Sequence, residues 1–309
     1  MKPTVVILLS DKRSGSTMFE NELCKHPEIS HVAYTPHTYN ETHHWLKAAC
    51  ILQMPKQLFN GYQIYKGYGS RQGARSYMID CIRGNVPDFV VPHNDESLVF
   101  EGWDVMCKQF AKPVFFEKSP QYPHHWATLS LILKWADTKE FNVKFIGLVR
   151  NPMAVMYSAQ ELFFTDPHER QFSWASCYRN ILAMKEMVGE EHFHLVRYED
   201  LIANPKERFR DICNYIGLDM CDDIGVNAHS GSLNKWWDDQ TFTMQLHESV
   251  SQLAKHFGYN KEDLYNPPKP GLTRTEKMRR NLKGTIKLSI ARIYDRFVKP
   301  VIINTIRRK

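Results

Sequence analysis

Two stretches of the chain combine an unbroken apolar run with a polar turn and a helical pattern. Residues 4–9 read TVVILL, a β-branched run typical of a buried parallel strand, and a polar turn follows at 10–17. Met18, Phe19 and Leu23 then recur at helical spacing. The run VKFIGLVRNP at 143–152 is followed in the same way by a helical pattern over 153–162. Both stretches predict a strand, a tight turn and a helix in succession.

The rest of the chain alternates strand and helix patterns and has no internal repeat. Further strands are predicted at 112–120 and 193–201, helices at 41–52, 125–137, 173–187, 206–217 and 243–258, and a loop followed by a helix at 61–84. The alternation indicates an α/β fold of three layers, with a central parallel β-sheet flanked by helices. Ligands of such sheets bind at the carboxyl ends of the strands, where the turns at 10–17 and 150–153 are expected to lie.

A segment rich in proline and glycine, residues 266–275, predicts a boundary between residues 1–265 as one domain and 266–309 as a C-terminal extension. The extension is basic and amphipathic, with Ile286, Ile290, Ile293 and Phe297 on one helical face. Two interpretations stay open: a helix that lies on a membrane surface, or a helix that packs on the domain and keeps a solvated basic face.

Charge and cysteine content narrow the class of protein. The 309 residues carry a net charge of +6, without any block of like charges, which suits an anionic ligand better than nucleic acid. Seven scattered cysteines without a C-x-x-C pair argue against a disulfide framework or a zinc site. A secretory leader and a membrane-spanning run are not seen, so we expect a cytoplasmic protein, with the extension as its one candidate membrane contact.

The turn DKRSGST, residues 11–17, has the chemistry of an anion site. A helix N-terminus offers N–H groups and the positive end of its dipole, Gly15 permits close backbone approach, and Arg13 can hold an anion with two hydrogen bonds. The hydroxyls of Ser14, Ser16 and Thr17 add donors. The turn lacks the Walker A pattern. Taken alone, it is equally consistent with a polar turn capped by a serine.

A second anion site is predicted after the strand at 143–152. Arg150 stands at the end of this strand, and Ser158 lies about two helical turns further on, so the pair can clamp a separate phosphate. The alternatives are an edge salt bridge for Arg150 and an exposed helical position for Ser158.

These two segments carry a resemblance to a known family. DKRSGSTMFENELCKHP resembles the 5′-phosphosulfate loop, and FIGLVRNPMAVMYS the 3′-phosphate segment, of the sulfotransferases that use 3′-phosphoadenylyl sulfate (PAPS). FHLVRYEDLIANPKERFRDICNYIGL, EKSPQYP and SGSLNKWW are similar to further stretches of the family, the second of them to carbohydrate, heparan-type and related members. The resemblance covers most of residues 4–260 and implies a P-loop-NTPase-like fold.

The resemblance implies sulfuryl transfer from PAPS to an acceptor hydroxyl by in-line displacement, which leaves adenosine 3′,5′-bisphosphate. It assigns Arg13 and the amides of Ser14 to Met18 to the 5′-phosphate, and Arg150 and Ser158 to the 3′-phosphate. Lys118 would face the sulfonate or the acceptor, and no metal is expected. The implied donor-binding residues are Lys12, Arg13, Ser14, Gly15, Ser16, Thr17, Met18, Arg150, Ser158, Tyr198 on the adenine side, Ser232 and Lys235.

The base that accepts the proton of the hydroxyl is expected within YTPHTYNETHHW, residues 34–45. Glu41 is the first choice, because ET opening a helix is similar to the glutamate position of bacterial and heparan-type relatives. His43, His37 and His44 are rivals, since many relatives read EP where this chain has Thr35-Pro36. Glu117 is not favoured as the base, and the alternative interpretation of this residue is a salt bridge to a neighbouring cation.

The acceptor is left open by the sequence. Aromatic and basic residues between 34 and 78 favour a carbohydrate or glycolipid, while other alcohols, phenols and peptide tyrosines stay open. Two rival functions are a kinase-like enzyme on the same scaffold and a non-catalytic nucleotide-binding protein that docks on a membrane or partner.

Overall fold

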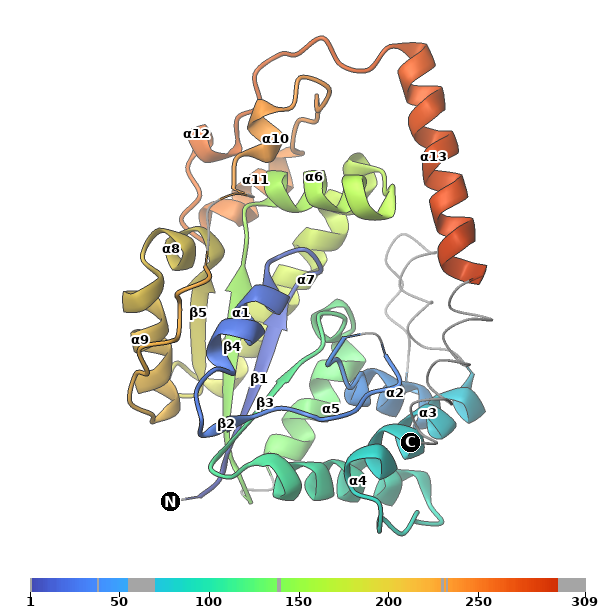
Figure 1. Cartoon of the computed structure of the whole chain (residues 1–309), viewed down its shortest axis with the longest axis vertical. Helices are drawn as coiled ribbons and strands as arrows, with labels where there is room; N and C mark the ends of the chain where they lie inside the picture. The colour runs from blue at the N-terminus through green and yellow to red at the C-terminus, as the bar shows by residue number, and fades with distance from the viewer. Residues whose placement is uncertain are drawn as a thin grey trace.

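The computed structural model describes residues 2–37, 39–54, 70–137, 140–228, 231 and 233–293, and of 287, 288, 291 and 292 only the backbone. Within these ranges one parallel sheet has the strand order β2-β3-β1-β4-β5, so β1 lies at its centre (Figure 1). The strands are β1 (Thr4–Ser10), β2 (Ile29–Ser30), β3 (Val114–Lys118), β4 (Asn142–Val149) and β5 (Phe193–Arg197).

Helices cover both faces of this sheet (Figure 1). Alternate residues of β1 enter two separate cores: Val5, Ile7 and Leu9 pack with α2, α4, α5 and α7, and Val6 and Leu8 with α1, α8 and α9. The predicted three-layer α/β fold is thereby confirmed. The helices are α1 (Ser16–Leu23), α2 (His44–Ile51), α3 (Arg71–Asn85), α4 (Asp95–Phe110), α5 (Trp126–Ala136), α6 (Pro152–Phe163), α7 (Pro167–Val188), α8 (Tyr198–Ala203), α9 (Pro205–Ile216), α10 (Lys235–Asp238), α11 (Glu248–Lys255), α12 (Lys261–Leu264) and α13 (Arg274–Ile293).

Several element boundaries differ from those that the sequence predicts. The strand at 193–201 ends at Arg197, because Glu199 and Asp200 fall in the first turn of α8, where acidic side chains favour a helix. The helix at 243–258 begins only at Glu248. Before it, the Asn266 amide donates to the carbonyls of Phe242 and Met244, and these bonds hold the backbone out of a helix.

The predicted extension is described up to residue 293. Its first residues pack on the domain: Asn266 is fully buried, and the Lys269 ammonium donates to the carbonyls of Trp236, Trp237 and Asp239. The helix α13 then runs along the outer edge of the molecule (Figure 1). Phe297 lies outside the described residues. No helix in the described ranges has both the length and the apolar sequence needed to cross a bilayer.

Candidate active site

The turn between β1 and α1 is shaped by Gly15. This residue has a φ of 91°, and a Cβ at its position would lie 2.2 Å from Cε2 of Tyr198. Gly15 precedes α1 without a side-chain capping bond, and the first turn of the helix contains no acidic residue. The N–H groups of the first turn therefore lie at the positive end of the helix dipole without an acidic side chain beside them. A helix N-terminus of this kind binds anions.

Two arginines from different strand ends meet beside this turn. Arg150, directly after β4, donates from Nη1 to the carbonyl oxygen of Arg13 at 3.1 Å, and Arg13 Nε donates to Ser158 Oγ on α6 at 3.0 Å. Burial and the neighbouring Arg150 guanidinium lower the pKa of Arg13. The two segments that the sequence singled out, about 140 residues apart, thus form one positively charged region.

A cavity of about 530 Å³ opens over this region, and we call it the β1–β4 cavity. The Tyr198 ring forms one part of its wall and lies 4.6 Å from the Arg150 guanidinium carbon. The predicted residues that line it are Arg13, Gly15, Ser16, Thr17, Arg150, Ser158, Tyr198 and Lys235. The remaining lining comes from Ala154, Tyr157, Glu161 and Leu162.

Three further predicted donor-binding residues, Lys12, Ser14 and Met18, do not line the β1–β4 cavity. Ser14 is buried, and because the Tyr178 hydroxyl donates to the Leu148 carbonyl, Ser14 Oγ donates its proton to Tyr178 at 2.9 Å. Ser14 therefore anchors the turn to α7 through its side chain. Lys12 is exposed, Met18 packs beside the core under α1, and Ser232 lies outside the described residues.

A second group of charges, the Glu41 cluster, consists of Glu41, His43, Lys118 and Glu20. Lys118, the last residue of β3, is fully buried, with its ammonium 3.1 Å from Glu20 Oε2 and 3.4 Å from Glu41 Oε1. His43 Nε2 lies 3.0 Å from Glu41 Oε2. Glu41 and His43 belong to the loop before α2, whereas the sequence placed them on the helix.

In the Glu41 cluster, the carboxylate of Glu41 is charged and the neighbouring imidazole of His43 is neutral. Burial raises the pKa of Glu41, but the hydrogen bond from His43 and the charge of Lys118 lower it to about 2. Burial lowers the pKa of His43, against the opposing effect of Glu41, and the charge of Lys12 lowers it further.

The two remaining histidine candidates differ in position. His37 Nδ1 lies 3.7 Å from Glu41 Oε2 and is partly exposed, so it borders the Glu41 cluster. His44 points into the core, where its Nε2 lies 2.9 Å from the Val99 carbonyl and burial lowers its pKa to about 4. His44 is thereby a packing residue.

Glu117 forms a network of hydroxyl groups beneath the same loop. Its Oε1 accepts hydrogen bonds from Thr42, Ser119 and Tyr122 at 2.8, 2.7 and 3.2 Å, and burial raises its pKa to about 7. The interpretation as an ordinary salt bridge is wrong, because these hydroxyls are its hydrogen-bond partners. The network holds Thr42, between Glu41 and His43, over the end of β3.

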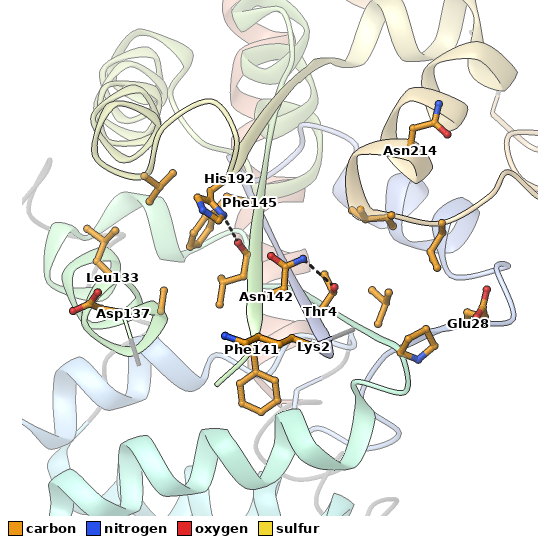
Figure 2. Close-up of a pocket in the computed structure, with 18 of the residues that line it drawn as sticks. Lys2, Thr4, Glu28, Leu133, Asp137, Phe141, Asn142, Phe145, His192 and Asn214 are labelled. Atoms are coloured by element: carbon orange, nitrogen blue, oxygen red, sulfur yellow. Dashed lines mark hydrogen bonds between the residues drawn. The ribbon is translucent and has the colours of Figure 1, made fainter. Parts of the chain in front are cut away.

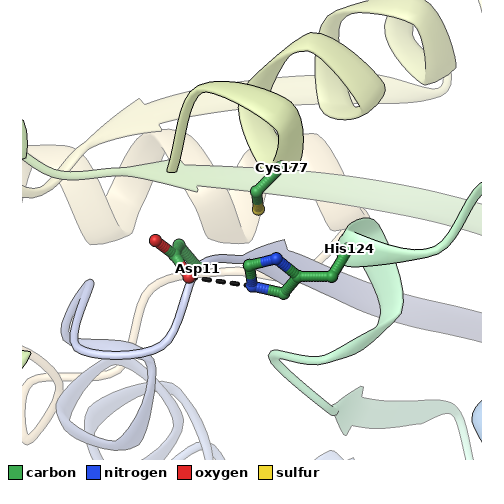
Figure 3. A group of neighbouring side chains, drawn as sticks. All are labelled: Asp11, His124 and Cys177. Atoms are coloured by element: carbon green, nitrogen blue, oxygen red, sulfur yellow. Dashed lines mark hydrogen bonds and ion pairs between the residues drawn. The ribbon is translucent and has the colours of Figure 1, made fainter. Parts of the chain in front are cut away.

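A buried ion cluster behind the turn was not predicted. Asp11 Oδ1 accepts from His124 Nε2 at 2.9 Å and from Arg170 Nη2 at 2.5 Å, and Cys177 lies nearby (Figure 3). Burial raises the pKa of Asp11, but Arg170 and His124 together lower it to about 2. Asp11, His124 and Cys177 have the spacing of metal ligands, yet the Arg170 guanidinium already supplies the positive charge there. The only sequence signal for this cluster was the position of Asp11, directly before Lys12 at the start of the turn.

A larger cavity of about 1170 Å³ lies at the opposite end of the sheet (Figure 2). Thr4, Asn142 and Phe145 line it near the amino ends of β1 and β4, together with Lys2 and His192. None of the residues that the sequence singled out lines this cavity.

Comparisons with known proteins place the chain. The model of the sulfotransferase family matches residues 3–223. The sulfotransferase domain of the Synechococcus PCC 7002 olefin synthase has a similar structure, with a TM-score of 0.58, 23% identity, and coverage of 83% of this chain and 95% of that domain. The sulfotransferase domain from the curacin biosynthetic pathway gives a TM-score of 0.54, 19% identity, and coverage of 84% and 98%. A search of curated protein sequences found no match.

Proposed function

The chain belongs to the sulfotransferase family, and we propose that it transfers a sulfuryl group from PAPS to a hydroxyl group of a carbohydrate or glycolipid. The observation that carries this proposal is the β1–β4 cavity, in which the β1–α1 turn, Arg150 and Ser158 share one space. PAPS bears phosphates at both ends of its ribose, and this cavity supplies cationic and N–H donors from two strand ends.

We assign a role in binding PAPS, the sulfuryl donor, to each end of the β1–β4 cavity. The first-turn N–H groups of α1 bind the 5′-phosphate and stabilise the charge that develops on it as the sulfuryl group departs. Arg150 and Ser158 bind the 3′-phosphate. The Arg13 guanidinium, bonded to Ser158, belongs to this 3′ end as well, which differs from the 5′ role that the resemblance implied. Tyr198 stacks on the adenine side, and Lys235 closes the cavity.

The acceptor side supplies the base. Because Glu41 is charged and bonded to both Lys118 and His43, it is a weak proton acceptor and a good partner for an imidazolium. We assign Glu41 and His43 to one unit, in which His43 Nδ1 takes the hydroxyl proton and Glu41 orients the ring. The bond from sulfur to the 5′-phosphate oxygen breaks as the bond to the acceptor oxygen forms.

Aromatic side chains beside this unit support a sugar acceptor. His37 lies 4.5 Å from His43 and 5.9 Å from Tyr39, and Tyr77 lies nearly parallel to His43 at 6.2 Å between ring centroids. Lys47 approaches the Tyr77 ring at 4.9 Å. Ring faces of this kind pack against sugar rings. Of the acceptor segment that the sequence indicated, residues 55–69 lie outside the described ranges.

Titration calorimetry with two nucleotides tests the donor side. We expect Arg150→Ala and Arg13→Ala to weaken binding of adenosine 3′,5′-bisphosphate about 10- to 100-fold, because each removes a charged hydrogen-bond donor. Binding of adenosine 5′-monophosphate should change little. Unchanged affinity of both variants for the bisphosphate would refute the site. Equal losses for both nucleotides would refute the assignment of these arginines to the 3′ end.

A screen of acceptors with labelled PAPS, read by mass spectrometry, tests the reaction itself. Sulfated glycans or glycolipids would support the proposed acceptor class, and transfer only to phenols would replace it. Turnover of ATP in place of PAPS would instead support the kinase-like alternative.

The domain organisation is part of the same proposal. We assign catalysis to residues 1–265 and treat 266–309 as an extension with a separate role.

A further inference from the structure

The helix α13 contacts the domain with its polar face. Arg280 pairs with Glu161 at the end of α6, and Gly284 is buried against Phe164, where a Cβ would meet the ring at 2.7 Å. Lys277 and Asn281, on the same face, line a cavity together with Phe164 and residues of the following loop. The contacts with the domain therefore come from the 277–280–281–284 face.

The apolar face of α13 points away from the domain. Its members follow each other at helical spacing and are half exposed or more: Met278 69%, Leu282 62%, Ile286 50%, Ile290 61% and Ile293 57%. A surface helix normally buries such a stripe against the core. The helix therefore contacts the domain, as one of the two interpretations of the sequence expects, but it does so through its polar face and not through its apolar stripe. The stripe is about 22 Å long at the rise of an α-helix.

Exposed apolar residues elsewhere on the described surface do not form such a row. Val90, Met187 and Val226 are strongly exposed, but they come from three separate segments. Single exposed apolar residues are ordinary, whereas a continuous apolar stripe marks a surface that another molecule covers.

The distribution of charge indicates which kind of molecule covers the apolar stripe of α13. Of 40 cationic and 34 acidic residues, 13 and 2 fall in residues 266–309, so the extension carries +11 and residues 1–265 carry −5. Arg279 and Lys283 are exposed at the border of the apolar stripe. Two copies that met through α13 would bring these positive charges together. A bilayer with anionic lipids offers both an apolar interior and negative charge.

We propose that α13 lies in the surface of an anionic membrane. The stripe from Met278 to Ile293 enters the boundary between headgroups and acyl chains, and Arg279 and Lys283 stay at headgroup level. This docking surface is independent of the sulfuryl-transfer reaction, although the Arg280–Glu161 pair joins it to the rim of the β1–β4 cavity.

Flotation of the full chain with vesicles tests the proposal. We expect the chain to float with vesicles of phosphatidylcholine and phosphatidylglycerol, and the double variant Ile286→Glu/Ile290→Glu to lose more than about 100-fold in binding, since two apolar anchors are lost. Arg279→Glu/Lys283→Glu should lose about 10-fold or more. Pure phosphatidylcholine vesicles should bind the wild-type chain more weakly.

The matched control is Val90→Glu/Met187→Glu, which places the same charges on exposed apolar positions of the domain and should float like the wild type. Urea unfolding of each variant verifies that it is folded. Absence of wild-type flotation, flotation that the α13 variants leave unchanged, or equal binding to neutral vesicles would overturn the proposal. A dimer in sedimentation experiments that Ile286→Glu/Ile290→Glu dissociates would assign the stripe to a second copy instead.

Discussion

On one side of the β1–α1 turn, Arg13 and Arg150 lie together, and on the other side Lys118 lies between the carboxylates of Glu20 and Glu41. Cations from separate strand ends gather in the β1–β4 cavity and create a positive field that favours an anionic ligand. In the Glu41 cluster the buried charges of Lys118 and its carboxylate partners compensate each other, so this cluster does not present a positive field to an anion. The comparison separates residues that should affect binding from those that should affect rate or stability.

The largest effect on rate is expected at the Glu41 cluster. Glu41→Gln should lower kcat about 100- to 10,000-fold, because the imidazolium of His43 loses its anionic partner. Calorimetric affinity for adenosine 3′,5′-bisphosphate should stay within error, since Glu41 does not line the β1–β4 cavity. An active Glu41→Gln enzyme would remove this residue from the mechanism.

The largest effect on stability is expected at Lys118. Lys118→Met leaves two buried carboxylates without their cation, and the free energy of unfolding should fall by about 3–5 kcal/mol. Urea denaturation measures this change. As a control, Lys108→Met removes an exposed partner of the exposed Glu140 and should cost below about 1 kcal/mol. Equal losses in both variants would contradict the buried triad, and adding Glu20→Gln to Lys118→Met should restore part of the stability.

A smaller effect, on nucleotide binding, is expected from a substitution of Gly15 in the β1–α1 turn. Gly15→Ala should weaken nucleotide binding about 10-fold or more, because the new Cβ collides with Tyr198 and the backbone of the turn must move. Gly217 is the matched control: it also has a positive φ, of 84°, but a Cβ there meets nothing within 4 Å. Gly217→Ala should lower stability by about 1 kcal/mol and leave nucleotide affinity unchanged. A similar affinity in both variants would contradict the close contact at Gly15.

The smallest expected effect is on the pH dependence of kcat/KM. Because burial lowers the pKa of His43 below its usual 6.5, the neutral base persists as pH falls, and kcat/KM should stay level from pH 8 to below pH 6.5 before it declines. Glu41 opposes this lowering, so in residual activity of Glu41→Gln the decline should move to still lower pH. An inflection above pH 6.5 would contradict the assignment of His43.

The arrangement of the residues that we propose for the donor side was predictable from sequence, because they belong to continuous strand–turn–helix units. The run 4–9, the turn at 10–17 and the segment 143–158 each keep their order in the fold, and the parallel sheet brings the two strand ends together. The sequence predicted that Gly15 permits close approach to a ligand, but it gave no sign that the Tyr198 ring lies against this glycine.

The acceptor side was less predictable because tertiary contacts determine it. Glu41 and His43 sit in an irregular loop whose position depends on Lys118 and on the hydroxyls around Glu117, more than 70 residues away in the chain. The Asp11 cluster brings Arg170 to Asp11 across 159 residues. The sequence carries no local pattern for such pairs. The exposure of the apolar face of α13 was also not predictable, since periodicity identifies an apolar face but does not indicate whether it faces the core or the solvent.

The central strand has a further consequence. β1 is bonded along its length to β4 on one edge and from Thr4 to Leu8 to β3 on the other, and Val5 to Leu9 are fully buried. Its amides should therefore exchange with deuterium only when the whole molecule unfolds. The turn that follows β1 is therefore anchored to a buried strand that is paired on both edges, which reduces the conformational entropy that the turn can lose when an anion binds.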